Sequence, residues 1–132
     1  MKSTTTKEIV KRFYDTKKPG NNEWQSMLAD GVTFKGTGMP SLQGKKSVIE
    51  ITDDLLSRLE SSEIKQMLVE GDTACVLNNY HMVLSNGEKF VLETSEIVGV
   101  RNGKIDSFDV YFDTAAFQKY FLPPCTAGLN VQ

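Results

Sequence analysis

Two Asn-Gly dipeptides constrain the fold of this chain more than any other feature of its sequence. Asn86-Gly87 and Asn102-Gly103 separate runs rich in Val, Ile, Phe and Tyr. Both residues of an Asn-Gly pair tolerate the positive φ that tight hairpin turns require. Residues 73–113 are therefore predicted to form three consecutive antiparallel strands, a meander on one face of which the rest of the chain would pack.

The composition limits the class of protein. The chain has 132 residues, of which 39% are hydrophobic and 24% charged, which suits one globular domain with a substantial core. The formal net charge is -2 with both signs interspersed, so we expect neither a nucleic-acid nor a membrane partner. No apolar run approaches the ~20 residues that span a bilayer, and residues 1–14 lack the apolar segment of a signal peptide. These features predict a cytoplasmic protein.

The motifs of metal and cofactor sites are absent from the sequence. Cys75 falls in a strand pattern and Cys125 in a Pro-containing tail, without the clustered spacing of a zinc site or a disulfide framework. The sequence has no glycine-rich phosphate loop and no serine nucleophile elbow. We therefore expect two reduced thiols, no metal and no cofactor.

Helical periodicity predicts three helices before the meander and one after it. Thr5 and Glu8 have the spacing of a capping box, Asn22 can cap a second helix, and Gly44 precedes the third. The helices are expected over residues 5–16, 22–30, 45–59 and 114–122. Alternating apolar residues also predict short strands over residues 32–35 and 63–69.

Three segments resemble a known superfamily: LADGVTFKGTG at residues 28–38, LQGKKSVIE at 42–50 and VRNGKIDSFDVYFDTAAF at 100–117. The superfamily includes nuclear transport factor 2 (NTF2), ketosteroid isomerases, scytalone dehydratase and SnoaL-type polyketide cyclases. The resemblance implies an α+β, cone-shaped NTF2-like (cystatin-like) fold, in which a curved antiparallel sheet and N-terminal helices enclose a pocket. It also implies a single SnoaL-like domain over residues 1–122, a C-terminal tail over 123–132, and a homodimer formed through the sheet.

The length of each turn decides which side chains share the pocket face, because side chains alternate along a strand. A two-residue turn at residues 86–87 would place Asn79 opposite Thr94 and His81 opposite Leu92. A three-residue loop at the second Asn-Gly would bring aromatic side chains of the last strand onto that face. The predicted lining is Leu77, Asn79, His81, Thr94, Glu96, Phe108, Val110 and Phe112 from the sheet, with Tyr14, Trp24, Phe34 and Leu55 opposite.

The register of the first hairpin has an alternative. A three-residue first turn would replace Asn79, His81 and Val83 on this face by Asn78, Tyr80 and Met82. The even-numbered set is the more apolar, and apolar side chains normally mark the covered face of a sheet. A dimer packed on the outer face, as is frequent in the superfamily, would account for apolar residues on both sides.

Glu96 is the strongest candidate for proton transfer. By the resemblance it aligns with the acid that binds the oxyanion in ketosteroid isomerases, and a carboxyl group on an apolar wall is suited to donate or accept a proton. His81 is the only histidine, but it would lie about 13 Å from Glu96 at ~3.3 Å per residue, too far for a direct pair. An exposed Glu96 and a structural or surface His81 are the alternatives.

The sequence also departs from the superfamily in residues that ketosteroid isomerases use for catalysis. The general-base Asp of ketosteroid isomerases falls at Gly36 or Thr37 here, whereas Tyr14 lies close to the position of their oxyanion tyrosine. Two readings of function therefore remain. The chain is either a cofactor-free isomerase, cyclase or dehydratase acting on a small hydrophobic carbonyl compound, with Glu96, His81 and Tyr14 as catalytic residues, or a non-catalytic domain that binds a ligand or a protein.

Overall fold

The computed structural model describes residues 2–115. Helices and strands follow one another in the order α1 (Lys2–Thr16), α2 (Glu23–Ser26), β1 (Leu28–Gly36), β2 (Leu42–Gln43), α3 (Lys45–Leu56), β3 (Leu59–Glu70), β4 (Thr73–Val83), β5 (Lys89–Arg101) and β6 (Lys104–Tyr111). No helix in this part of the chain is long and apolar enough to cross a bilayer.

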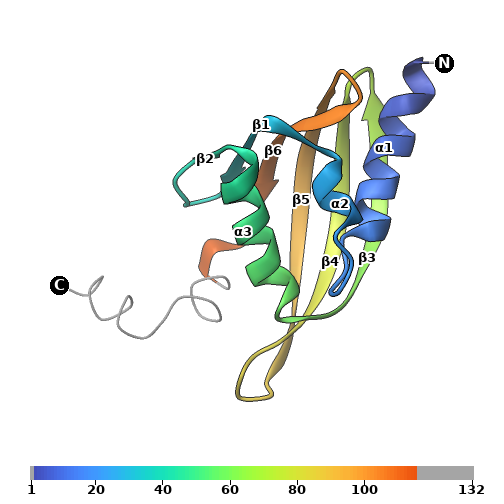
Figure 1. The fold of residues 1–132 in the computed structure, drawn as a ribbon. Helices are drawn as coiled ribbons and strands as arrows, with labels where there is room; N and C mark the ends of the chain where they lie inside the picture. Colours follow the sequence, from blue (N-terminus) through green and yellow to red (C-terminus); the bar gives the residue numbers. More distant parts are fainter. Residues whose placement is uncertain (1, 116–132) are drawn as a thin grey trace.

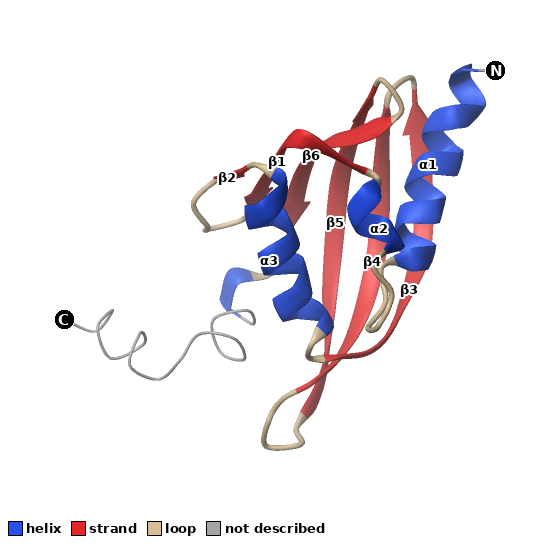
Figure 2. Ribbon diagram, in the orientation of Figure 1, coloured by secondary structure: helices blue, strands red, loops and turns tan. Residues whose placement is uncertain are grey.

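The strands form one curved six-stranded sheet in the order β2-β1-β6-β5-β4-β3. Only β1 and β6 pair in parallel, and the remaining neighbours are antiparallel. All three labelled helices lie over the same face of the sheet (Figures 1 and 2). This arrangement confirms the predicted α+β fold, with a curved sheet and N-terminal helices.

The first hairpin of the meander has the alternative register. Tyr80 lies opposite Leu92 and Asn78 opposite Thr94, so the prediction of a two-residue turn is wrong. The Leu84 N–H donates to the Glu88 carbonyl (2.8 Å), which encloses a three-residue loop. A shift of one residue moves every side chain of a strand to the other face, and the register observed here buries the more apolar set.

In the second hairpin, the side chains of β6 lie on the predicted face of the sheet, although the turn differs from the predicted one. Asn102 and Gly103 form a two-residue turn with φ of 53° and 78°, between Arg101 and Lys104, which pair with each other. The three-residue loop is therefore wrong. A bulge next to Gly99 restores the alternation, and a Cβ at Gly99 would lie 2.4 Å from the Ser107 hydroxyl.

The predicted helices are correct in number before the meander but not in extent. α1 begins at Lys2 rather than Thr5, and α3 ends at Leu56. α2 ends at Ser26 rather than near residue 30, because the chain from Leu28 onward pairs with β6. Pairing with a neighbouring strand supplies backbone hydrogen bonds that outweigh local helical preference. The final helix beyond Ala115, the tail at 123–132 and Cys125 lie outside the described residues.

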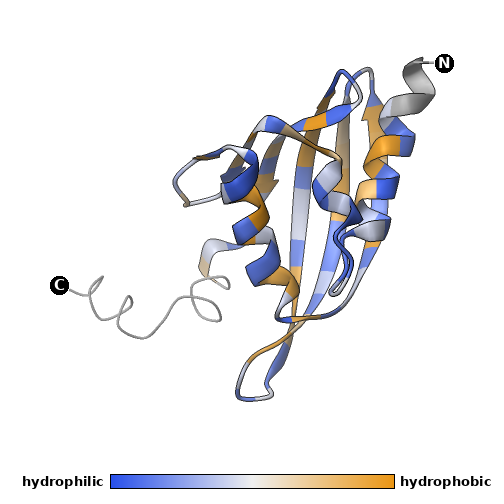
Figure 3. Ribbon diagram, viewed as in Figure 1, coloured by the Kyte–Doolittle hydropathy of each residue, from blue (hydrophilic) through white to orange (hydrophobic). Residues whose placement is uncertain are grey.

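The core fills the space between the helices and the sheet. Buried and less buried positions alternate along β4 and β5, and apolar segments occur on both the helices and the strands (Figure 3). The inward-facing set packs against α1 and α2. Phe13 is central, with ring centroids 6.2 Å from Trp24 and 5.4 Å from Phe108. Aromatic packing of this kind holds α1 firmly against β6, which positions the site described next.

Candidate functional site

Glu96 is a buried carboxylate on β5 that accepts hydrogen bonds from three hydroxyl groups. Its side chain is on the inner face, and the residue is 4% exposed. Oε1 accepts from the Tyr14 hydroxyl, and Oε2 accepts from the Tyr80 hydroxyl (2.6 Å) and from Thr94 Oγ1 (2.7 Å). We call these four residues the hydroxyl network. Glu96 therefore lies among polar groups and not on the purely apolar wall that the sequence suggested.

The network joins three elements of the fold, since Tyr14 comes from α1, Tyr80 from β4, and the other two residues from β5. Glu96 lies opposite Val76 in the sheet, four residues along β4 from Tyr80. Such an offset separates the backbones by about 13 Å, and the long Tyr and Glu side chains bridge it. A backbone offset of this size does not by itself exclude a direct pair.

Lys17 extends the network with a buried ammonium group. It follows the last residue of α1, is 7% exposed, and donates from Nζ to the Tyr80 hydroxyl at 2.7 Å. Nζ also lies 4.5 Å from the ring centroid of Tyr14, 4.9 Å from that of Tyr80 and 5.5 Å from that of Phe13. Cation–π attraction from three rings helps to stabilise a charge that has little access to water.

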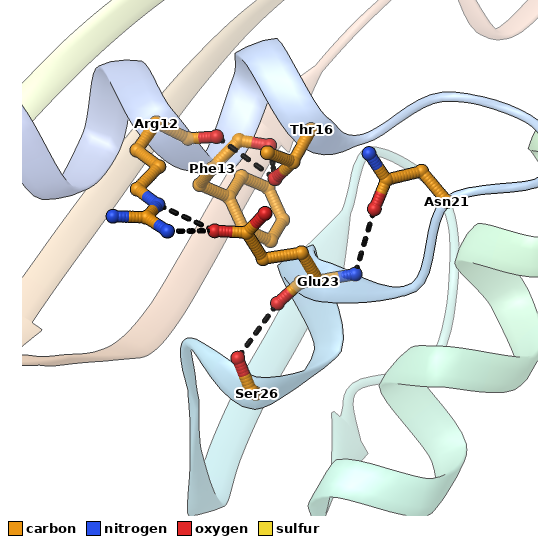
Figure 4. Close-up of polar contacts among 6 residues, drawn as sticks. All are labelled: Arg12, Phe13, Thr16, Asn21, Glu23 and Ser26. Carbon is orange, nitrogen blue, oxygen red and sulfur yellow. Dashed lines mark hydrogen bonds and ion pairs between the residues drawn. The ribbon is translucent and has the colours of Figure 1, made fainter.

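The C-terminal end of α1, which carries Tyr14 and directly precedes Lys17, is tied to α2 (Figure 4). Arg12 donates to the Glu23 carboxylate, and the Thr16 hydroxyl donates to the Arg12 carbonyl (2.8 Å). The Glu23 N–H donates to Asn21 Oδ1, whereas Asn22, the predicted cap, makes no side-chain capping bond. These contacts fix the chain direction just where Lys17 leaves the helix.

Burial shifts the pKa values of the surrounding groups in opposite directions. Burial, and then the Glu96 carboxylate, raise the pKa of Tyr14 and of Tyr80 well above 10.0. Burial lowers the pKa of Lys17 from 10.5, while Glu96 acts against that shift. Both tyrosines are therefore neutral hydrogen-bond donors at physiological pH, and the amine of Lys17 loses its proton more readily than that of an exposed lysine.

A cavity of about 460 Å³ opens onto this polar group between α3 and the sheet. Four polar residues form one end of its lining: Lys17, Tyr80, Thr94 and Glu96. Apolar side chains form most of the rest, and the principal ones are Phe34, Met39, Pro40, Ile51, Leu55, Leu92, Val110 and Phe112. A mainly apolar wall with a few convergent polar groups is typical of small-molecule sites.

The structure brings together half of the residues predicted for the site. Those that line the cavity are Phe34, Leu55, Thr94, Glu96, Val110 and Phe112. Tyr14 contacts Glu96 from the core side, and Trp24 and Phe108 belong to the core. Their predicted place in the lining is wrong because the large rings fill the narrow space under α1.

Three predicted residues lie on the opposite face of the sheet: Leu77, Asn79 and His81. The observed register turns them outward, and both polar side chains face Glu63 there. His81 Nε2 is 3.3 Å from Glu63 Oε1, and Asn79 Nδ2 is 3.5 Å from Glu63 Oε2. His81 and Glu96 therefore share no cavity, and the predicted role of His81 in the site is wrong.

Sequence reasoning missed Lys17 and Asp54 and placed Tyr80 only in the alternative register. Lys17 follows Phe13 by four residues and Tyr14 by three, the spacing of side chains on one helix face, which was a usable signal. Asp54 lines the cavity from α3 and lies 3.5 Å from Arg58. Among residues 2–115, no cluster of three or more His, Cys, Asp or Glu side chains could hold a metal ion.

Comparison with known proteins identifies similar domains. The profile of the SnoaL-like domain matches residues 10–108. A candidate SnoaL-like polyketide cyclase from Jannaschia sp. CCS1 is 15% identical, with a TM-score of 0.78 over 92% of this chain and 95% of that one. An NTF2-like protein of unknown function from Cytophaga hutchinsonii ATCC 33406 is 22% identical, with a TM-score of 0.69 over 85% and 93%.

A de novo designed protein with a curved β-sheet is 24% identical, with a TM-score of 0.72 over 90% of this chain and 93% of that one. No curated protein matches the chain at a significant level. Likeness to solved structures at these identities shows the fold alone. A designed protein also has this fold, so the fold by itself implies no particular chemistry, which depends on the residues of the site.

Proposed function

Because this chain belongs to the family of SnoaL-like domains, we propose that it binds a small, largely apolar carbonyl compound and moves a proton on it. The observation that carries the proposal is the Glu96 carboxylate, buried among hydroxyl groups at the polar end of a mainly apolar cavity. The apolar walls would hold the body of the ligand and exclude water, while the polar end would orient its carbonyl group.

The chemistry uses side chains alone. A carboxylate has about four acceptor positions, and the three hydroxyl groups occupy one on Oε1 and two on Oε2. Oε1 keeps one position for a proton taken from the carbon beside the ligand carbonyl. The Lys17 ammonium group, at the same end of the cavity, would stabilise the negative charge that develops on the carbonyl oxygen.

The experiment measures hydrogen–deuterium exchange beside the carbonyl of 2-tetralone, an apolar ketone, by NMR in D₂O. We expect the protein to accelerate the exchange over buffer, and Glu96→Gln to lower that acceleration by at least ~100-fold. Glu93→Gln is the matched control, because Glu93 is an exposed residue of the same strand. Equal exchange rates for Glu96→Gln and the unmodified protein would contradict the role of Glu96.

Binding without turnover is the second candidate function. It is favoured by the satisfied state of Glu96, which already accepts three hydrogen bonds, and by the glycine and threonine at positions 36 and 37, where ketosteroid isomerases would carry a base. In that case 2-tetralone would shift NMR resonances of cavity residues such as Leu92 without any gain in exchange rate.

We further propose that two copies associate through the outer face of the sheet. Leu68, Ile97 and Tyr111 are exposed there by 57%, 37% and 54%, and the register places Leu68 and Ile97 in one row across the sheet, on either side of Cys75. Large apolar side chains gathered on one face are typical of protein contacts.

We also propose a cytoplasmic location for the protein, in which the free thiol of Cys75 would stay reduced.

The double variant Ile97→Lys, Tyr111→Lys is expected to sediment as a monomer at a concentration where the unmodified protein sediments as a dimer. Two charged side chains would have to be desolvated in the proposed contact. Val91→Lys is the control, since Val91 is 47% exposed on the same face but lies beside His81, in its polar half. An unchanged sedimentation coefficient for the double variant would argue against this surface.

A further inference from the structure

We propose that Lys17 is a nucleophilic amine, which forms an imine with an aldehyde or ketone held in the cavity. The inference rests on the proposed binding of a carbonyl compound, but it assigns that compound a covalent attachment point. Lys17 lines the cavity together with Tyr80 and Glu96, and its Nζ lies beside the Tyr80 hydroxyl of the hydroxyl network.

The surroundings of Lys17 Nζ are typical of a reactive amine and differ from those of a lysine held in an ion pair. Among residues 2–115, no carboxylate oxygen lies within ion-pair distance of Nζ. Its polar partner is the Tyr80 hydroxyl, 2.7 Å away, and Glu96 is reached only through that hydroxyl. A buried lysine that donates to a neutral hydroxyl oxygen and lies among aromatic rings keeps its lone pair accessible once it has lost a proton.

The neighbouring lysine provides a comparison within the same chain. Lys18 is exposed enough to be partly solvated, and its Nζ donates to Ser62 Oγ at 3.1 Å, away from the cavity. Burial lowers the pKa of Lys17, so a larger fraction of its amine is neutral near pH 7 than for an ordinary lysine. The two adjacent lysines therefore differ in burial and in access to the cavity while sharing one stretch of backbone.

The step balances without any oxidant or reductant. The Nζ lone pair attacks the carbonyl carbon, a C–N bond forms, and the carbonyl π electrons move to oxygen. One nitrogen proton passes through the hydroxyl network to that oxygen, which gives a neutral carbinolamine. The second nitrogen proton passes by the same network to the hydroxyl group, which leaves as water, and a C=N bond remains. Hydrolysis reverses the sequence. Protonated, the imine withdraws electrons from the adjacent carbon, whose proton Glu96 would then remove more easily.

The test traps the imine by reduction. The full chain is incubated with 2-tetralone and sodium cyanoborohydride, which converts an imine into a stable secondary amine, and the modified lysine is located by peptide mass mapping. We expect about one adduct per chain, located on Lys17. Mapping on the unmodified protein answers the question even if a Lys17 variant fails to fold.

Two variants test whether the adduct forms on Lys17 and not on another lysine. Lys17→Arg keeps the positive charge but has no nucleophilic amine, so it should lose the adduct, whereas Lys18→Arg should keep it. Adducts spread over the exposed lysines, or absent altogether, would overturn the inference. Exchange of 2-tetralone protons without an adduct on Lys17 would overturn the imine and leave the proposed proton transfer standing. An adduct without exchange would support the imine and count against proton transfer by Glu96.

Discussion

Replacing Glu96 by Ala is expected to lower the free energy of unfolding by about 3–5 kcal/mol, the range for removing one member of a buried charged group. The change leaves the hydroxyl groups of Tyr14, Tyr80 and Thr94 without their acceptor. It also leaves the Lys17 ammonium group buried without a compensating negative charge nearby. Urea unfolding followed by circular dichroism at pH 7 gives the measurement.

Two further variants show where that loss comes from. Glu93→Ala removes an exposed carboxylate from the same strand and should change the free energy of unfolding by no more than ~0.5 kcal/mol. The double variant Lys17→Met, Glu96→Leu removes both charged groups together and should recover part of the loss, because apolar residues can replace buried charges at little cost. A loss below about 1 kcal/mol for Glu96→Ala would contradict an enclosed network.

Between pH 10 and pH 11 the protein is expected to lose about 2 kcal/mol of stability, through Tyr14 and Tyr80 together. Both have a pKa well above 10.0 in the folded chain. The unfolded chain therefore releases these protons first, and deprotonation pulls the equilibrium toward unfolding. The stabilisation is complete below pH 10 and is lost as pH rises toward the folded pKa values.

Lys17 acts with the opposite sign at lower pH. Its folded pKa lies below 10.5, so the unfolded chain holds the Lys17 proton more tightly, and stability increases as pH rises through the folded pKa toward 10.5. Stability should pass through a maximum below the tyrosine range. Urea unfolding at intervals between pH 8 and pH 11 would trace the curve.

Tyr14→Phe serves as the control for the alkaline prediction. It removes one of the two buried hydroxyl protons, so the decline between pH 10 and pH 11 should shrink by about 1 kcal/mol, whatever the variant's stability at pH 7. The slope, and not the absolute stability, is the quantity to compare. An unchanged slope would mean that the Tyr14 hydroxyl ionises as readily in the folded chain as in the unfolded one.

The meander could be predicted from its Asn-Gly turns, but the length of the first turn could not. Asn86-Gly87 is compatible with a two-residue turn or a three-residue loop, and the choice depends on which face is covered. The apolar character of Tyr80 and Met82 was the better guide, because burial of a whole strand face outweighs the preference of one turn. That choice placed Tyr80 in the site and His81 outside it.

The central position of Glu96 could be predicted from the sequence, whereas its surroundings could not. The alternation along β5 placed Glu96 on the inner face in either register of the first hairpin. A Lys-Lys-Pro-Gly run such as residues 17–20 normally marks a solvated helix end. The spacing from Phe13 and Tyr14 places Lys17 on their face of the helix, but its burial also depends on the tertiary contact with Tyr80, which local sequence does not encode.

The bulge beside Gly99 and the short Asn102-Gly103 turn have a consequence for how such chains can change in length. Each shifts the alternation of β6 by one residue, and together they leave Phe108 and Val110 facing inward. A single-residue deletion in either place would turn β6 inside out, whereas a deletion in one matched by an insertion in the other would leave the cavity wall unchanged. Insertions and deletions in this hairpin should therefore be tolerated in compensating pairs, a rule that deletion scanning of residues 99–107, which includes the unpaired Asp106, can examine directly.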